Sequence, residues 1–166
     1  MVNVSASRRD EILRWLDEVK DPEVPVLSIR ELGVLRDVEV ADEAVTVIMT
    51  PTYSGCPAMH AMEAEVVETL ARHGVPNARV KTVYAPAWTT DWISEDAKAK
   101  LEAYGIAPPG RAESNDLVPL RRRAPVRCPY CGSVNTTMRS EFGSTACKAM
   151  HRCLDCLEPF EHFKPI

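Results

Sequence analysis

Apolar residues recur at helical spacing near the start of the chain. The positions on one face are Ile12, Leu13, Leu16 and Val19. Ser7 can cap this helix, because a serine hydroxyl accepts a hydrogen bond from the first turn. Asp21-Pro22 and Pro25 should end it, since a residue that precedes proline avoids the helical conformation. The pattern predicts one amphipathic helix before residue 21.

Two runs of β-branched residues follow, at residues 34–40 and 44–50. Residues 41–43 form a short polar connection between them, so the two runs should pair as antiparallel strands. A loop with the sequence PTYSGCP then leads to a second helical pattern. Its apolar positions are Met59, Met62, Val66, Val67 and Leu70. Pro57 suits the first helical position, and Gly74 suits the end of the helix.

Residues 79–84 are typical of a third strand, and Ser94 can cap a last helix that ends at Gly105. The order helix, strand, strand, helix, strand, helix predicts a small layered α/β (α+β) domain over residues 1–107. Residues 108–124 are rich in proline and charge, so we expect a linker. Residues 125–166 are too few for a large core and hold five of the six cysteines, which predicts a zinc-ribbon β domain.

Composition and charge narrow the class of protein. The chain has 166 residues, 45% hydrophobic and 27% charged, which is typical of a globular protein. No apolar run is long enough to cross a membrane, and the first residues do not resemble a secretion signal. We therefore expect a cytoplasmic protein. Residues 1–110 carry a formal charge of −7 and the remainder +3, which argues against a nucleic-acid surface on the first part.

Four cysteines form two Cys-x-x-Cys pairs, Cys128 with Cys131 and Cys153 with Cys156. A tight turn at this spacing can direct both thiolates at one ion, so the pairs predict a structural zinc site. An iron or iron-sulfur centre on the same thiolates, and four unliganded buried thiols, are the alternatives. Cys147 and His151 are possible auxiliary ligands, although each is more simply a residue of the intervening hairpin.

Cys56 lies in the PTYSGCP loop, at the expected start of the second helix. The helix dipole and unpaired backbone N–H groups at such a position favour a reactive thiolate. Nearby residues that could donate hydrogen bonds are Thr50, Thr52, Tyr53 and Ser54. His60 lies one turn further on and could pair with the thiol. The alternative is that Cys56 is a small buried apolar residue.

Several motifs resemble those of a known family. They are DPEVP at 21–25, MTPTYSGCP at 49–57, PAWTTDWISEDAKAKLEAYGIAPP at 86–109, and the C-terminal CPYCGS, FGSTACKAMHRC and CLEPFEHFKP. Together they resemble the phenylacetate-degradation protein D (PaaD) family. In that family a SufT-like iron-sulfur assembly domain precedes a zinc ribbon. The likeness covers nearly the whole chain.

The resemblance implies a non-catalytic accessory protein of aerobic phenylacetate catabolism. Its expected role is maturation of the iron centres of the phenylacetyl-CoA epoxidase, with the epoxidase subunits and especially their iron-sulfur reductase as partners. In the family the loop cysteine that matches Cys56 is the functional thiol, and an acidic residue that matches Asp21 or Glu23 lies in the same signature region. The implied cofactors are structural zinc and transient iron or an iron-sulfur cluster.

Other functions remain open from the sequence. The chain could be an integral subunit or docking adaptor of the epoxidase, with Cys56 purely structural, and it could form a homodimer. A nucleic-acid-binding ribbon would need a basic stripe, and residues 121–123 form the only basic run. A thiol-disulfide enzyme would need its Cys-x-x-Cys pair at the start of a helix.

Overall fold

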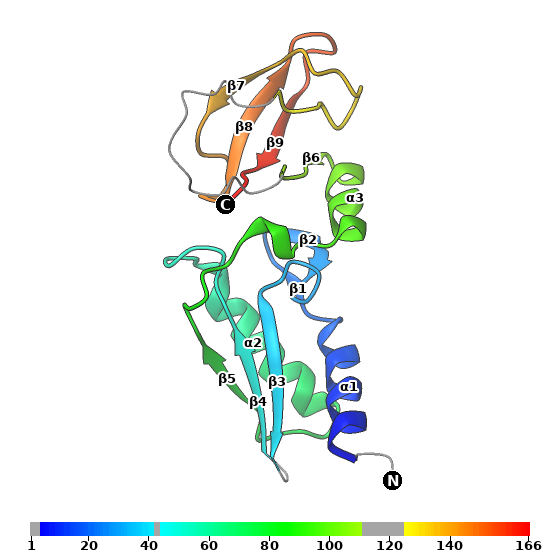
Figure 1. Ribbon diagram of the computed structural model, residues 1–166, viewed down its shortest axis with the longest axis vertical. Helices are drawn as coiled ribbons and strands as arrows, with labels where there is room; N and C mark the ends of the chain where they lie inside the picture. Colours follow the sequence, from blue (N-terminus) through cyan, green and yellow to red (C-terminus); the bar gives the residue numbers. More distant parts are fainter. Residues whose placement is uncertain (1–3, 42–43, 111–124) are drawn as a thin grey trace. The chain divides into compact units, whose positions relative to one another are not determined.

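The computed structural model describes residues 4–41, 44–110 and 125–166, with side chains from residue 7 onward (Figure 1). The described chain divides into two compact units, Met1–Trp88 and Thr89–Ile166. This division places helix α3 (Glu95–Ala103) and strand β6 (Ile106–Ala107) in the second unit. The sequence pattern predicts the helix but not the strand, and it assigns the residues of both to the first domain, 1–107. Residues 111–124, most of the expected linker, lie outside the described residues.

The first unit contains a three-stranded sheet in the order β3-β4-β5. Strands β3 (Leu35–Ala41) and β4 (Ala44–Met49) pair antiparallel, which confirms the prediction from the two β-branched runs. Strand β5 (Arg79–Thr82) pairs parallel with β4, and helix α2 (Ala58–Arg72) connects these two strands. A separate pair, β1 (Lys20–Asp21) and β2 (Val24–Ser28), precedes the sheet.

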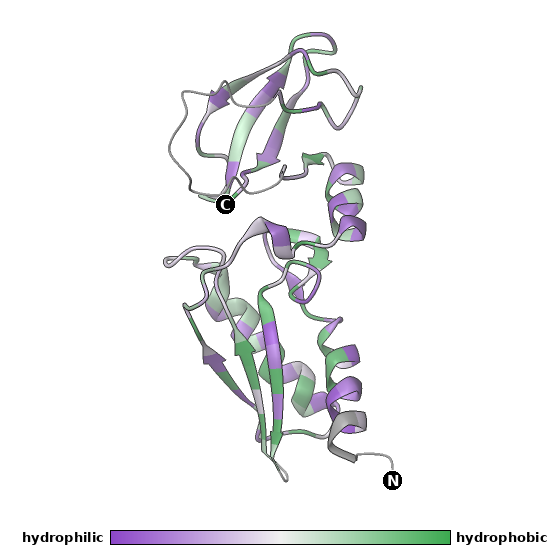
Figure 2. Ribbon diagram, in the orientation of Figure 1, coloured by the Kyte–Doolittle hydropathy of each residue, from purple (hydrophilic) through white to green (hydrophobic). Residues whose placement is uncertain are grey.

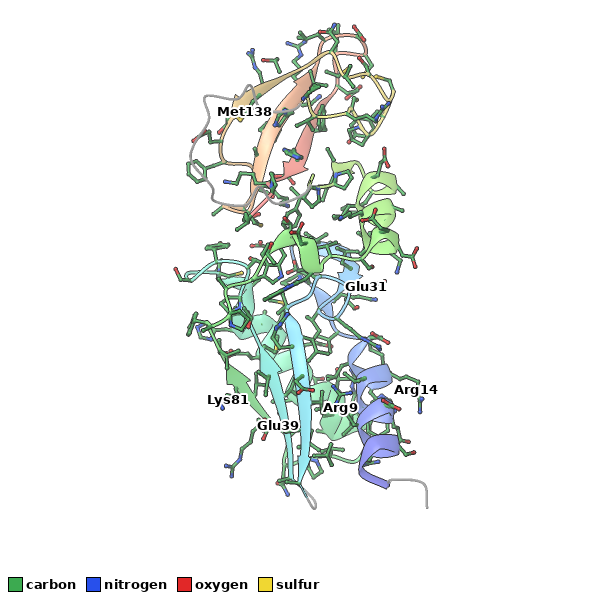
Figure 3. All side chains as sticks on the ribbon, viewed as in Figure 1. Arg9, Arg14, Glu31, Glu39, Lys81 and Met138 are labelled. Atoms are coloured by element: carbon green, nitrogen blue, oxygen red, sulfur yellow. The ribbon has the colours of Figure 1, made fainter. Side chains whose placement is uncertain are left out.

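Helices α1 (Val4–Leu16) and α2 pack on each other and on the strands of this sheet. Apolar side chains of these helices and of β3 and β4 are buried, and the hydrophobic stretches of the two strands are green in Figure 2. Arg9 donates a hydrogen bond to Asp37 at 2.6 Å and so ties α1 to β3 (Figure 3, where Arg9 is labelled).

The start of α1 differs from the prediction. The helix begins at Val4, so Ser7 lies inside it and does not cap it. Helix α1 also ends at Leu16, before Asp21 and Pro22, and Asp21 belongs to β1. Pro22 therefore lies in the β1–β2 turn and Pro25 in β2, and neither ends the helix.

The second unit contains a four-stranded sheet in the order β6-β9-β8-β7. Strand β8 (Lys148–Cys153) pairs antiparallel with both β7 (Thr136–Ser140) and β9 (Pro159–Phe163), and β6 pairs parallel with β9. A short 3-10 helix, η1 (Thr90–Trp92), precedes α3. Ser94 caps α3 by accepting a hydrogen bond from the Ala97 N–H at 3.2 Å, as predicted. The observed fold class is therefore a mixed α/β unit together with a ribbon of antiparallel strands.

Among the described residues, no helix combines the length and the apolar character that a membrane span requires.

Candidate metal centre and thiol loop

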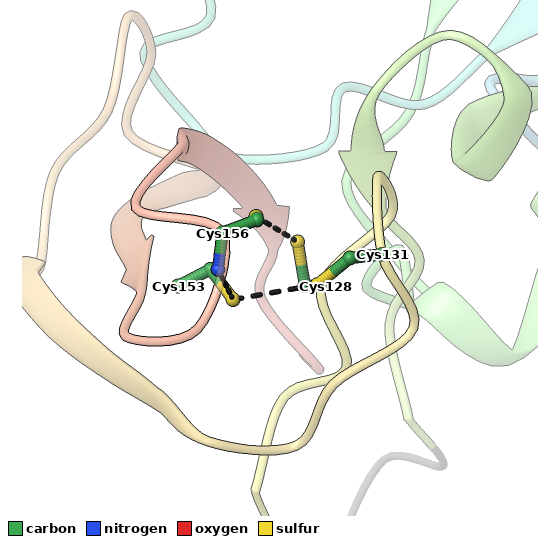
Figure 4. A group of neighbouring side chains, drawn as sticks. All are labelled: Cys128, Cys131, Cys153 and Cys156. Carbon is green, nitrogen blue, oxygen red and sulfur yellow. Dashed lines mark hydrogen bonds between the residues drawn. The ribbon is translucent and has the colours of Figure 1, made fainter.

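The four cysteines of the two Cys-x-x-Cys pairs form one compact group in the second unit (Figure 4). Their sulfur atoms all lie within 4.8 Å of one another. Cys128 Sγ lies 3.8 Å from Cys156 Sγ, and Cys131 Sγ lies 3.5 Å from Cys153 Sγ. Four sulfurs about 2.3 Å from a tetrahedral zinc ion are about 3.8 Å apart. The arrangement therefore fits a tetrathiolate zinc site.

Each Cys-x-x-Cys pair lies in a turn, and the two turns have the same hydrogen-bonding pattern. The Cys128 N–H donates to the Ser133 carbonyl at 2.8 Å, and the Cys153 N–H donates to the Glu158 carbonyl at 3.0 Å. In both turns the residue after the second cysteine has a positive φ, which is 75° in Gly132 and 68° in Leu157. Glycine adopts this conformation freely, whereas leucine does so at a cost. The two turns, residues 128–133 and 153–158, thus share one backbone form although their residues differ, and we call each of them a knuckle.

Asp155 joins the two knuckles. Its carboxylate accepts hydrogen bonds from the Ser133 hydroxyl at 2.5 Å and from the Asn135 side-chain amide at 2.7 Å. These two donors lower the pKa of Asp155, so it is ionised and the contacts are charge-assisted. The first knuckle is thereby held opposite the second.

The electrostatics of the group favour a bound dication. The backbone N–H of Cys156 leads the effects that lower the pKa of Cys153 to about 7. The pKa of Cys156 rises to about 12 although the Glu158 N–H opposes the rise, because loss of water and the other three sulfurs disfavour a further negative charge. Four crowded thiols ionise together only when a cation lies among them. The donor set is soft and closed, which suits structural zinc.

Cys147 and His151 lie outside this group of four. Cys147 is buried, and its sulfur lies 3.0 Å from the Thr145 hydroxyl. His151 is buried on β8, where its ring stacks on Phe160 and meets the edge of His162. Both positions are those of packed residues within the ribbon. An auxiliary role for either residue stays a prediction.

Cys56 lies in the loop that joins β4 to α2. The helix begins at Ala58 with Pro57 as its cap, so Cys56 stands one residue before the cap. Its backbone N–H donates to the Tyr53 carbonyl at 3.1 Å, and its carbonyl accepts from the Met59 N–H at 3.3 Å. These bonds hold the thiol at the N-terminal end of α2, and its side chain is partly exposed. The expected position at a helix start is confirmed.

Burial outweighs the expected stabilisation of the Cys56 thiolate by the N-terminus of α2. Burial is the largest effect and raises the pKa of Cys56 above its ordinary value. The Ala58 N–H at the helix end opposes the rise, but the charges of Glu23 and Asp21 add to it. Cys56 is therefore a protonated thiol at neutral pH, and an approaching cation would favour its ionisation.

The charges of Asp21 and Glu23 act on the thiol of Cys56. Asp21 is buried, and its Oδ1 accepts hydrogen bonds from the N–H groups of Glu23 at 2.7 Å and Val24 at 2.8 Å. These bonds fix the carboxylate within the β1–β2 turn. Thr50, at the loop's first position, buries a hydroxyl that has no hydrogen-bond partner among the described residues.

A cavity of about 260 Å³ opens beside Cys56. Its lining residues come from the loop, from the first turns of α2 and from the end of β5, and they are Pro51, Ser54, Gly55, Cys56, Pro57, Met59, His60, Glu63, Thr82 and Tyr84. The sequence pattern indicates His60 beside the thiol but does not indicate Glu63, Thr82 or Tyr84. The sequence does hold one signal for Glu63: it lies three residues after His60 on a predicted helix, so the two side chains are neighbours on one face. Thr82 and Tyr84 reach the site through the parallel pairing of β4 with β5, which is a long-range contact.

Comparison with known proteins matches each part of the chain to a described family. Residues 9–85 match a family model described as iron-sulfur cluster assembly protein, and residues 112–164 match one described as PaaD zinc beta ribbon domain. The chain is 43% identical over 166 residues to a protein of Escherichia coli (strain K12) that is named as a putative 1,2-phenylacetyl-CoA epoxidase subunit, and the match covers all of this chain and 98% of that protein. The chain belongs to the PaaD family.

Other relatives match about three fifths of this PaaD-family chain. An "Fe-S protein maturation auxiliary factor" of Porphyromonas gingivalis is 35% identical over 103 residues, which are 61% of this chain and 97% of that protein. The crystal structure of a domain of unknown function, DUF59, from Bacillus anthracis is 27% identical with a TM-score of 0.56. The match covers 59% of this chain and 94% of the crystallised chain. That share of the chain covers almost the whole length of both relatives.

Proposed function

We propose that this chain is a non-catalytic accessory protein of phenylacetate catabolism that helps to mature the iron centres of a phenylacetyl-CoA epoxidase. Cys56 is the thiol that takes up and releases iron or a cluster, and Asp21 and Glu23 assist it. The iron-sulfur reductase of the epoxidase is the expected recipient.

The position of Cys56 carries this proposal. It is the only cysteine among residues 1–88, and it is partly exposed in the unit that matches the iron-sulfur assembly model. The charges of two carboxylates, Asp21 and Glu23, act on its thiol. A single thiolate with few other soft ligands binds a metal weakly enough to release it. Exchange of a cargo requires such weak binding.

The ribbon cysteines have the opposite role in the proposal. Zinc held by Cys128, Cys131, Cys153 and Cys156 would have four thiolate ligands and no open position, which is the form of a structural site. Zinc supplies folding free energy to a segment with a small core, in which Cys128 and Cys153 pack against Phe160 and Ala107.

Transfer of labelled iron tests the role of Cys56. Protein loaded anaerobically with ⁵⁵Fe is mixed with apo-reductase, and the label that reaches the reductase is measured over time. Wild type should transfer the label, and Cys56→Ser should transfer at least about tenfold less, because the alcohol is a far poorer metal ligand than the thiolate.

Cys147→Ser is the matched control, since it removes one thiol from the second unit without touching Cys56 or the group of four. It should transfer at the wild-type rate. Equal transfer by Cys56→Ser and wild type would refute the proposed function.

A docking adaptor or integral subunit is a second candidate. The relative that matches over its whole length, ribbon included, is named as an epoxidase subunit, whereas the maturation factor from Porphyromonas gingivalis matches 61% of this chain. The two knuckles also expose the apolar side chains of Tyr130, Leu154 and Leu157. Stable, stoichiometric co-purification with the mature oxygenase would favour this role over transient maturation.

A further inference from the structure

We infer that the cavity beside Cys56 is a mixed-ligand site for a single ferrous ion, in which Cys56 supplies sulfur, His60 nitrogen and Glu63 oxygen. The inference rests on the proposed function and names its cargo as one mononuclear Fe²⁺ rather than an iron-sulfur cluster.

The chemistry of the cavity wall supports a mixed ligand set. The three side chains line one cavity of about 260 Å³, and they come from the loop and from the first two turns of α2. Sulfur, imidazole nitrogen and carboxylate oxygen together suit a borderline divalent ion of the first transition row. Non-haem Fe²⁺ is commonly held by imidazole and carboxylate with positions left open.

The cavity does not suit a cluster. Iron-sulfur clusters are held by several cysteine thiolates, commonly four. Cys56 is the only thiol on the cavity wall and the only one among residues 1–88. A cluster there would need sulfur ligands from other molecules, whereas one Fe²⁺ needs none beyond Cys56.

Glu63 is already fixed toward the cavity. Its Oε1 accepts a hydrogen bond from the Thr82 hydroxyl at 2.6 Å, and its Oε2 lies 3.7 Å from His60 Nδ1. Thr82 is the last residue of β5, so the parallel pairing of β5 with β4 sets the orientation of this carboxylate. A carboxylate ligand that is itself hydrogen-bonded is the usual arrangement in metal sites.

His60 is the movable member of the set. Its side chain is 93% exposed, so its ring can rotate onto an ion without disturbing the core. Within the described part of the chain, only the four ribbon thiols already lie close enough together to form a ready ligand group. Cys56, His60 and Glu63 do not form such a group before an ion binds. Binding therefore requires His60 to move, which makes it correspondingly weak and reversible.

Binding is a ligand exchange without electron transfer. Fe²⁺ loses bound water, the Cys56 S–H bond breaks, an Fe–S bond forms, and the proton leaves to solvent. Iron stays ferrous throughout. Release to a stronger thiolate ligand set on a recipient returns the proton to Cys56.

Anaerobic titration of the zinc-loaded full-length chain with ⁵⁷Fe²⁺ tests the inference. Binding is followed by equilibrium dialysis, and the bound iron is examined by Mössbauer spectroscopy and by assay for acid-labile sulfide. Wild type should bind about one high-spin Fe²⁺ per chain without sulfide. His60→Gln and Glu63→Gln should each weaken binding at least about tenfold. Glu68→Gln, an exposed position on the same helix, should bind as wild type does.

The outcomes separate this inference from the proposed function. If Cys56→Ser abolishes binding and iron transfer while His60→Gln and Glu63→Gln change neither, the mixed site is wrong and the role of Cys56 stands. Iron bound with equimolar sulfide at Cys56 would overturn the mononuclear cargo. If Cys56→Ser leaves both binding and transfer unchanged, the proposed function fails as well. Thermal unfolding of each variant shows that it is folded.

Discussion

The thiol of Cys56 lies in surroundings that keep it protonated at neutral pH. Burial raises its pKa, and the charges of Glu23 and Asp21 raise it further. The ribbon cysteines face a different environment, in which backbone N–H groups lower the pKa of Cys153 to about 7. The pKa of Cys156 rises to about 12 against the opposing Glu158 N–H, because loss of water and the neighbouring sulfurs disfavour another negative charge. The proposed roles follow this difference, with Cys56 as the thiol that takes up a cation and the ribbon thiols as those that hold one permanently.

The raised pKa predicts slow alkylation of Cys56. Only the thiolate reacts with iodoacetamide, so the rate should be low at pH 7 and should rise about tenfold per pH unit until the pH passes the pKa. Glu23→Gln removes a charge that raises the pKa, so the thiolate fraction and the rate at pH 8 should increase severalfold. Peptide mass analysis of the zinc-loaded protein assigns the label to Cys56.

Glu68→Gln is the control for this measurement, because it removes the same charge from an exposed position on α2. Its alkylation rate should equal that of wild type. Rapid alkylation of wild-type Cys56 at pH 7, or a Glu23→Gln rate no higher than that of wild type, would contradict the electrostatic account of the loop.

At the scale of elements, the two zinc knuckles offer a matched comparison. Gly132 and Leu157 occupy equivalent positions with φ values of 75° and 68°. Gly132→Ala should lower the stability of the second unit by about 1 kcal/mol, because a Cβ is strained in the left-handed region. Leu157→Gly should raise it by up to about 1 kcal/mol, since the exposed leucine side chain contributes little packing.

Thermal unfolding of the zinc-loaded variants measures both changes, which correspond to shifts of a few degrees in Tm. Leu154→Ala is the control, because this exposed leucine lies in the same knuckle and has no positive φ. Its Tm should stay near that of wild type. A lower Tm for Leu157→Gly would show that the leucine packs more than its exposure indicates.

The elements that the sequence predicted well are those with a local signal. Strands β3 and β4 follow from β-branched runs, α2 from helical spacing and Gly74, and α3 from the cap at Ser94. Strands β1, β2 and β6 were missed because they are short and their pairing partners define them. The start of α1 was wrong because Ser7 has the residue type of a cap but lies inside the helix.

The residues of the candidate sites also divide into those with a local sequence signal and those without one. The four ribbon cysteines follow from their spacing alone, and their close grouping agrees with it. An acidic residue matching Asp21 or Glu23 was implied by the family resemblance rather than by any local pattern, and the charges of both residues act on Cys56. Thr82 was beyond sequence reasoning because a parallel strand pairing brings it to Glu63.

At the scale of the whole molecule, the two kinds of thiol belong to different units. Cys56 lies in Met1–Trp88, which matches the iron-sulfur assembly model over residues 9–85. The group of four lies in Thr89–Ile166, which contains the PaaD ribbon match. Each site can therefore be altered without changing a ligand of the other.

Metal analysis of protein purified anaerobically tests this division of roles most directly. Wild type and Cys56→Ala are compared for zinc, iron and acid-labile sulfide per chain. The account predicts zinc near one per chain in both proteins, and iron in wild type only. A well-folded wild type without zinc, or iron retained at the wild-type level by Cys56→Ala, would contradict it.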